Sequence, residues 1–409
     1  MSQLTDYVVF NDEKLAKKYR SAPIPMSVLY EAYFDGDLDI RGSLFDLLAS
    51  RHLFVKYTIT RQHLQWAVTN YVPEMVVHTK HQDARVVSEV YDRGNDFFEW
   101  FLGPTMVYTT GVYEHAGQSL DEAQRRQVHH VARKLQLSRG ERLLDIGCGW
   151  GTLLADCAEQ CGVDATGITL SQKQTDYANH MLRQRGLEST ARVLCQDYRD
   201  LEAEAKFDKI LCLEMIEHVG FANLGAFCEQ LHGLLEDDGL FLLQWTGLRR
   251  ALKSEDLIWG LFMNKYVFPG ADAALPPSSM LKTLEKAGFE LATIDNVSGH
   301  FGTTLRAWHA NWNRNRDAVL AAYGERWFRI WNFFLAWSAL VAEQGNAGAY
   351  QAVLYKNAQH FNRRRWIPSV PQLVQGSGEP LQDSSPESRV VAQNDPTPLR
   401  AANARLRQR

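Results

Sequence analysis

The sequence predicts an α/β fold in which parallel strands alternate with crossover helices, with helical segments added before and after this core. Two observations support the prediction. Short apolar runs alternate with amphipathic segments between residues 141 and 297. The first apolar run ends in the glycine-rich turn LLDIGCGWG, residues 143–151, and such a turn joins a buried strand to a helix while a ligand approaches the backbone.

The composition is that of a globular protein. The 409 residues are 45% hydrophobic and 22% charged, and the net charge of −4 gives no electrostatic case for a nucleic-acid partner. The six cysteines, all between Cys148 and Cys228, lack the spacing of metal ligands, so we expect reduced thiols and no metal site. No secretory signal and no run of roughly 18 apolar residues is found. These features favour a cytoplasmic protein, with peripheral contact at the inner face of a membrane left open.

Three regions are expected along the chain. Residues 1–80 form a small helical N-terminal region, where Leu44, Leu47 and Leu48 recur at helical spacing. Residues 81–366 form the main α/β domain, which ends in further helices. Residues 367–409 form a disordered tail, because apolar residues become scarce there and Gln, Ser, Pro, Asn and Arg dominate.

The core elements follow in a regular order. Strands are expected at Arg142–Ile146, Asp164–Thr169, Ala191–Leu194, Phe207–Leu213 and Leu240–Trp245. Helices are expected at Leu120–Leu137, Thr152–Glu159, Gln172–Arg185, Leu224–Leu235 and Ser278–Ala287. A final strand pair, Phe289–Val297 with Thr303–Trp308, closes the sheet. The aromatic insertion 246–277 is placed as a lid over the carboxyl end of the sheet, where ligands bind in open α/β folds.

The glycine turn indicates the cofactor. Gly147, Gly149 and Gly151 follow Asp145 at every second position, whereas dehydrogenases bind pyrophosphate with a GxGxxG spacing. The ligand expected here is S-adenosylmethionine, which has no pyrophosphate, with Asp145 orienting the turn and the methionyl amino group. A purely structural turn is the competing interpretation.

Polar residues at the next two strand ends are candidates for the rest of the cofactor. Thr169 and Gln174 follow the second strand and would meet the ribose. Asp197 and Tyr198 follow the third and would meet the adenine amine and ring face, although Tyr198 fits plain core packing equally well.

At these residues the chain resembles the cyclopropane-fatty-acid synthase and mycolic acid methyltransferase family. The resemblance covers about residues 88–355 and is carried by the motifs YDRGNDFF, MVYTTGVYE, LLDIGCGWG, GITLSQKQ, QDYRDL, IEHVG and NKYVFPG. Residues 255–273 and 315–338 are most similar to the fungal sphingolipid C-9 methyltransferases. The resemblance implies a class I S-adenosylmethionine-dependent methyltransferase fold, which is a Rossmann-like seven-stranded sheet with added helices and an apolar tunnel for an acyl chain. It places cofactor contacts on Tyr108, Thr109, Asp145, Gly147, Gly149, Trp150, Gly151, Thr169, Leu170, Gln174, Tyr198 and Arg199.

The resemblance also carries a catalytic hypothesis. Methyl transfer to an alkene leaves a carbocation, which aromatic faces can stabilise and which must then lose a proton or be reduced. In the cyclopropane-forming family a bicarbonate base is held by Cys, Glu, His and Tyr. The matching positions here are Thr110, Glu217, Gln244 and Phe301, so only the glutamate is kept. We therefore expect Glu217 to be the base or to orient one, with His218 and His300 as alternatives and structural roles as the competing interpretation.

The sequence thus predicts an S-adenosylmethionine-dependent C-methyltransferase. Its expected substrate is a double bond of an unsaturated lipid chain, either fatty acyl or sphingoid base, with a methyl-branched or cyclopropane product. The alternatives are a small-molecule N- or C-methyltransferase of related architecture and a non-catalytic lipid-binding protein. The basic residues Arg249, Arg250 and Lys253 beside the aromatic insertion favour membrane contact. A homodimer is left open.

Overall fold

The computed structural model describes residues 3–59, 80–91, 93–115, 117–202, 204–271 and 275–358. The predicted disordered tail, residues 367–409, lies outside these ranges, as do residues 60–79 of the predicted N-terminal region. None of the helices in the described ranges is long and apolar enough to cross a membrane.

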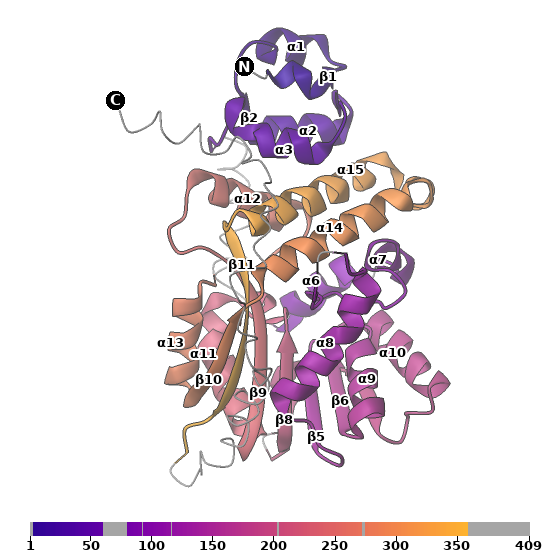
Figure 1. The fold of residues 1–409 in the computed structure, drawn as a ribbon, viewed down its shortest axis with the longest axis vertical. Helices are drawn as coiled ribbons and strands as arrows, with labels where there is room; N and C mark the ends of the chain where they lie inside the picture. The colour runs from indigo at the N-terminus through magenta and orange to yellow at the C-terminus, as the bar shows by residue number, and fades with distance from the viewer. Residues whose placement is uncertain are drawn as a thin grey trace, which may run out of the picture. The chain divides into compact units, whose positions relative to one another are not determined.

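A seven-stranded sheet forms the centre of the fold, with strand order β10-β11-β9-β8-β5-β6-β7 (Figure 1). The strands are β5 (Arg142–Ile146), β6 (Asp164–Thr169), β7 (Ala191–Cys195), β8 (Phe207–Leu213), β9 (Leu235–Leu248), β10 (Phe289–Asn296) and β11 (Ala347–Lys356). Strand β11 runs antiparallel to both of its neighbours, β9 and β10, and the other pairs in the sheet are parallel. This arrangement confirms the predicted fold class, a Rossmann-like seven-stranded α/β sheet.

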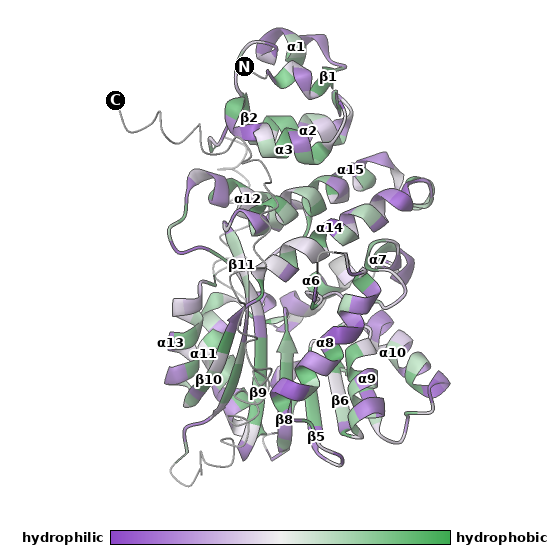
Figure 2. Cartoon of the chain, viewed as in Figure 1, coloured by the Kyte–Doolittle hydropathy of each residue, from purple (hydrophilic) through white to green (hydrophobic). Residues whose placement is uncertain are grey.

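Helices cover both faces of the sheet. On one face α11 (Leu224–Leu234) and α13 (Pro277–Lys286) bury apolar side chains against β5, β8, β9 and β11. The other face carries α8 (Leu120–Leu135), α9 (Thr152–Cys161) and α10 (Gln172–Gln184). Figure 2 shows β5 and β8 as mostly hydrophobic, as expected for parallel strands covered on both faces.

A helical layer lies beyond the carboxyl ends of the parallel strands (Figure 1). It contains α6 (Lys80–Tyr91), α7 (Asn95–Leu102), α12 (Ser254–Tyr266), α14 (Ser298–Arg314) and α15 (Arg316–Glu343). The last of these bends at Gly324, whose φ of 78° lies outside the helical range. Aromatic side chains from these helices form one continuous core, which closes the sheet edge where ligands bind in such folds.

The N-terminal part contains more than helices. Its helices are α1 (Glu13–Tyr19), α2 (Met26–Asp35) and α3 (Leu44–Ser50). Four short strands pair alongside them: β1 (Val8–Phe10) with β3 (Leu38–Ile40), and β2 (Ile24–Pro25) with β4 (Val55–Lys56). Both α2 and α3 contact α15, so this part packs against the helical layer.

One strand of the predicted final pair is confirmed and the other is wrong. Phe289–Asn296 forms β10, but the segment Thr303–Trp308 lies inside helix α14, and the partner of β10 is β11. Thr304, Leu305, Trp308 and Trp312 are buried on one side of α14, so its apolar residues follow the helical period rather than the alternation of a strand. The segment Thr303–Trp308 is too short for its apolar residues to distinguish a helical period from the alternation of a strand.

Candidate active site

A glycine turn follows β5 and forms the floor of a cavity at the carboxyl edge of the sheet. Gly147, Gly149 and Gly151 all have positive φ angles, of 79°, 54° and 77°. A Cβ atom at Gly147 would lie 2.5 Å from Cγ of Met215, and one at Gly151 would lie 2.8 Å from Cβ of Ala178. At Gly149 a Cβ atom would meet nothing within 4 Å. Packing therefore requires two of the glycines, while Gly149 leaves the cavity open for a ligand.

The residues flanking this turn also lie at the cavity. Asp145 is 3% exposed, and burial raises the pKa of its carboxyl to about 7. Trp150 lines the cavity and donates a hydrogen bond of 2.9 Å from Nε1 to Oδ1 of Asn95 in α7. The glycine turn is thereby tied to the helical layer that covers it.

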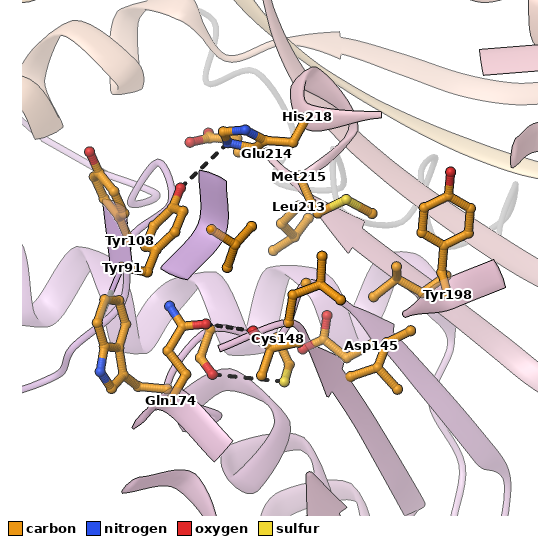
Figure 3. Close-up of a pocket in the computed structure, with 18 of the residues that line it drawn as sticks. Tyr91, Tyr108, Asp145, Cys148, Gln174, Tyr198, Leu213, Glu214, Met215 and His218 are labelled. Atoms are coloured by element: carbon orange, nitrogen blue, oxygen red, sulfur yellow. Dashed lines mark hydrogen bonds between the residues drawn. The ribbon is translucent and has the colours of Figure 1, made fainter. Parts of the chain in front are cut away.

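The cavity is also lined at the carboxyl end of β6, by Thr169, Leu170 and Gln174. The Thr169 hydroxyl donates a hydrogen bond of 2.6 Å to Oε1 of Gln174. Because that bond occupies the carbonyl oxygen of the side-chain amide, the Gln174 amide nitrogen remains as a donor for a bound molecule (Figure 3).

On the far side of the cavity Arg199 is held by two carboxylates. Its guanidinium bonds both oxygens of Asp197, at 2.8 and 2.6 Å, and also Asp83 of α6 at 2.7 Å. Arg199 and Tyr198 line the cavity, whereas Asp197 lies behind them and orients Arg199. The Tyr198 ring packs edge-on against Phe227. Asp83, which also lines the cavity, was missed because nothing in its sequence context distinguishes it from a surface residue of a helix.

An aromatic wall stands opposite the glycine turn. Tyr91, Tyr108 and His218 line the cavity, and the Tyr91 hydroxyl points toward Nε2 of His218 at 3.4 Å (Figure 3). Phe268 packs against both Tyr108 and His218. Thr109 also lines the cavity, with its hydroxyl bonded to the amide of Gln127 in α8 at 2.9 Å.

Two of the predicted catalytic residues meet at a carboxylate that sequence reasoning missed. Thr110 and Gln244 do not line the cavity; both donate hydrogen bonds to Glu214, which does. Glu214 directly follows β8, and an acidic residue at the carboxyl end of a buried parallel strand is a signal that could have identified it.

The remaining catalytic candidates lie apart from one another. Glu217 is 8% exposed, and its Oε1 accepts hydrogen bonds from the backbone N–H of Thr246 at 2.5 Å and from the Thr246 hydroxyl at 2.9 Å. Burial raises the pKa of Glu217 to about 7, with a further contribution from the charge of Glu214. His300 accepts a hydrogen bond from the backbone N–H of Tyr113 at 3.2 Å and does not line the cavity.

Comparison with known proteins identifies the family. The model of the mycolic acid cyclopropane synthetase family matches residues 78–352. The sphingolipid C9-methyltransferase of Komagataella phaffii is 44% identical over 381 residues, which cover 90% of this chain and 78% of that protein. A probable fatty acid methyltransferase of Pseudomonas putida is 30% identical over 333 residues, covering 81% of this chain and 82% of that one.

Solved structures agree with this assignment. The mycolic acid cyclopropane synthase CmaA1, in complex with SAH and CTAB, superposes with a TM-score of 0.64 at 26% sequence identity. The match covers 67% of this chain and 98% of that one. The glycine turn and the cavity at the carboxyl edge of the sheet fit the same cofactor. The chain therefore belongs to the mycolic acid cyclopropane synthetase family and is an S-adenosylmethionine-dependent methyltransferase.

Proposed function

We propose that this protein transfers the methyl group of S-adenosylmethionine to a double-bond carbon in the chain of an unsaturated lipid. Its relatives are named for sphingolipid and fatty acid substrates, and both kinds of lipid chain carry such bonds. The observation that carries the proposal is the composition of the cavity wall, where tyrosine rings and the half-buried Glu214 carboxylate line the same cavity as the glycine turn.

The aromatic wall suits the chemistry of an alkene. Because an isolated double bond is a weak nucleophile, it must be held close to the sulfonium in an oriented site without water. Methyl transfer then places positive charge on the neighbouring carbon, and aromatic faces stabilise such charge. Tyr91 and Tyr108 supply these faces, and burial raises the pKa of both phenols, so they stay neutral.

We assign the cofactor to the residues around the glycine turn. Backbone N–H groups of the turn and the Asp145 carboxylate would hold the methionyl end, and the Gln174 amide would donate to the ribose. Tyr198 would contact the adenine. Arg199, fixed by Asp83 and Asp197, would close the adenine side together with α6.

We further propose a peripheral contact with an anionic membrane at the cytoplasmic side, made by the start of α12. Leu252 and Leu257 are exposed there, at 45% each. In the sequence, Lys253 lies between these two leucines and Arg250 lies two residues before Leu252. Arg249, by contrast, is paired with buried Asp256 at 2.9 and 3.0 Å and has little charge to offer a lipid headgroup. Neither Arg250 nor Lys253 forms an ion pair with a carboxylate among the residues that the structure describes, and exposed leucines next to such cations suit an anionic lipid surface.

Mass spectrometry of lipids from cells expressing the protein, compared with cells lacking it, tests the proposed function. We expect a lipid whose unsaturated chain gains one methylene unit in mass. A lipid profile identical in the two cell lines would contradict the proposal and favour a small amine as the methyl acceptor.

A further inference from the structure

Glu214 has an unusual backbone conformation and lines the cavity. It directly follows β8 and has a φ of 52°, in the left-handed region that non-glycine residues rarely adopt. Its N–H donates a hydrogen bond of 2.9 Å to the carbonyl oxygen of Gln244, which fixes this turn. Residues held in such strained conformations gather at functional sites. Here the turn brings the carboxylate to the cavity, which His218 also lines (Figure 3).

All the hydrogen bonds to Glu214 reach one of its two oxygens. Oε1 accepts from the backbone N–H of Thr110 at 3.2 Å, from the Thr110 hydroxyl at 2.5 Å and from Nε2 of Gln244 at 2.6 Å. Among the described residues none donates to Oε2. One oxygen is therefore anchored, and the other remains as an acceptor on a residue that lines the cavity.

A chain of side-chain amides fixes which end of the Gln244 side chain faces Glu214. Oε1 of Gln244 accepts a hydrogen bond of 2.8 Å from Nε2 of Gln351 in β11, and Oε1 of Gln351 lies 2.9 Å from Nε2 of His130 in α8. Since its carbonyl oxygen is occupied, Gln244 must present its NH2 group to Glu214. Donors aimed at one oxygen favour the ionised carboxylate and hold it in a single orientation.

The aromatic wall lies within electrostatic reach of this carboxylate. The negative charge of Glu214 contributes to raising the pKa of both Tyr91 and Tyr108, which line the cavity. A fixed negative charge beside aromatic faces stabilises a cation formed between them. Burial also raises the pKa of Glu214 itself, which makes its carboxylate a better proton acceptor.

We propose that Glu214 is the base of the reaction and accepts through Oε2 the proton lost from the carbocation. This proposal rests on the proposed function. The π electrons of the alkene form a bond to the methyl carbon, and the carbon–sulfur bond breaks with its electron pair moving to sulfur. The neighbouring carbon becomes the cation. A C–H bond next to it then breaks, its electrons form the new carbon–carbon bond, and the proton moves to Glu214. No oxidant or reductant is required.

Glu217 does not take this role in the proposal. Both hydrogen bonds to its Oε1 come from Thr246, its Oε2 is buried, and it does not line the cavity. With a pKa of about 7, raised partly by the nearby charge of Glu214, Glu217 holds a proton for much of the time at neutral pH. The two carboxyls thus have different environments, because Glu214 lines the cavity whereas Glu217 is held by Thr246 outside it.

The test uses two substitutions in the full chain. Glu214→Gly suits the positive φ and leaves the donors of Thr110 and Gln244 facing an empty space, whereas Glu214→Gln fills that space with an amide. Turnover should fall by roughly 10²–10⁴-fold in both variants, as is typical when a general base is lost. Affinity for S-adenosylmethionine, measured by calorimetry, should change little. Glu236→Gln, at the opposite end of the sheet and bonded to Arg142, is the matched control and should keep normal turnover.

Added formate or acetate separates a base from a structural residue. A small carboxylate should bind the donors left open in Glu214→Gly and restore turnover as its concentration rises, while Glu214→Gln stays inactive. Near-normal turnover of either variant, or no rescue of a folded Glu214→Gly that binds the cofactor, overturns the assignment of Glu214. If the wild-type protein binds the cofactor but methylates no unsaturated lipid, the proposed function fails and the assignment fails with it.

Discussion

Arg51 donates a hydrogen bond of 2.7 Å from Nε to Oε1 of Glu255, and this bond joins the N-terminal part of the chain to helix α12. The Arg51 side chain is fully buried, and that of Glu255 is 10% exposed. The same guanidinium donates to the carbonyl oxygen of Leu48 and to Oε1 of Gln344 at the end of α15. One buried cation thus satisfies acceptors from three segments that are far apart in the sequence.

Replacing Arg51 by methionine should therefore destabilise the protein strongly. The substitution leaves the Glu255 carboxylate buried without its partner, which typically costs about 3–5 kcal/mol. Urea denaturation measures the loss. Arg192→Met, which removes the exposed ion pair with Asp164, is the control and should cost less than about 1 kcal/mol. Equal effects of the two substitutions would show that the buried pair does not fasten the N-terminal part.

Gly149→Val should abolish binding of S-adenosylmethionine while the protein remains folded. The new side chain meets no atom within 4 Å of its Cβ position and so occupies the space left for the ligand. Its positive φ should cost only about 1–2 kcal/mol of stability. Calorimetry with S-adenosylmethionine measures the binding, and unchanged affinity in a folded variant would contradict this placement of the cofactor.

Gly147→Ala provides a contrast at the same turn. Its Cβ atom would lie 2.5 Å from Cγ and 2.7 Å from Cβ of Met215, so the turn or the following segment must shift. We expect a clear fall in melting temperature, in contrast to Gly149→Val. A melting temperature equal to that of the wild type would show that Met215 moves aside freely.

The strand-and-turn pattern of the core could be predicted from sequence because it is local. LLDIGCGWG contains both the buried strand and the glycines with positive φ, and each crossover helix follows its strand directly. The position of β11 could not be predicted in this way. It enters the sheet between β9 and β10 after two long helices, and only tertiary pairing determines such an insertion.

The same distinction applies to the candidate site. Motif matching placed Thr110 and Gln244 near the catalytic centre, and the structure brings them together. Motif matching pointed to Glu217, because the motif IEHVG contains this residue. Glu214 lies in the same short segment but outside the motif, and it was therefore missed. Which carboxylate faces the cavity depends on the positive φ of Glu214, a backbone feature that the residue type does not reveal.

The stability of Glu217→Gln relative to the wild type should depend on pH. The pKa of Glu217 is raised from 4.5 to about 7 in the folded protein, so folding favours the protonated form. Its contribution to stability is present below pH 4.5 and is lost as the pH rises toward 7. Glutamine mimics the protonated acid and does not titrate. The melting temperature of the variant, relative to that of the wild type, should therefore rise between pH 5 and pH 8, as measured by parallel melting curves. A difference that does not vary with pH would contradict the raised pKa.

Binding to anionic vesicles should depend on both charge and apolar exposure at the start of α12. We expect the wild-type protein to cosediment with phosphatidylserine vesicles at low salt and to dissociate as salt screens Arg250 and Lys253. Leu257→Asp should weaken binding, because it places a negative charge among the exposed leucines. Asp295→Asn, on the sheet edge strand β10, is the control. Absence of binding by the wild type at low salt would contradict the proposed membrane contact.

The most direct test of the account follows a labelled methyl group into a lipid. The purified protein is incubated with S-adenosylmethionine carrying a fully deuterated methyl group and with vesicles of unsaturated sphingolipid or phospholipid, and the lipid chains are examined by mass spectrometry. We predict label on a former double-bond carbon, with all the deuterium retained in a methyl-substituted alkene and one deuterium lost in a cyclopropane. Label that appears only in an added small amine, with none in any lipid chain, would contradict alkene methylation.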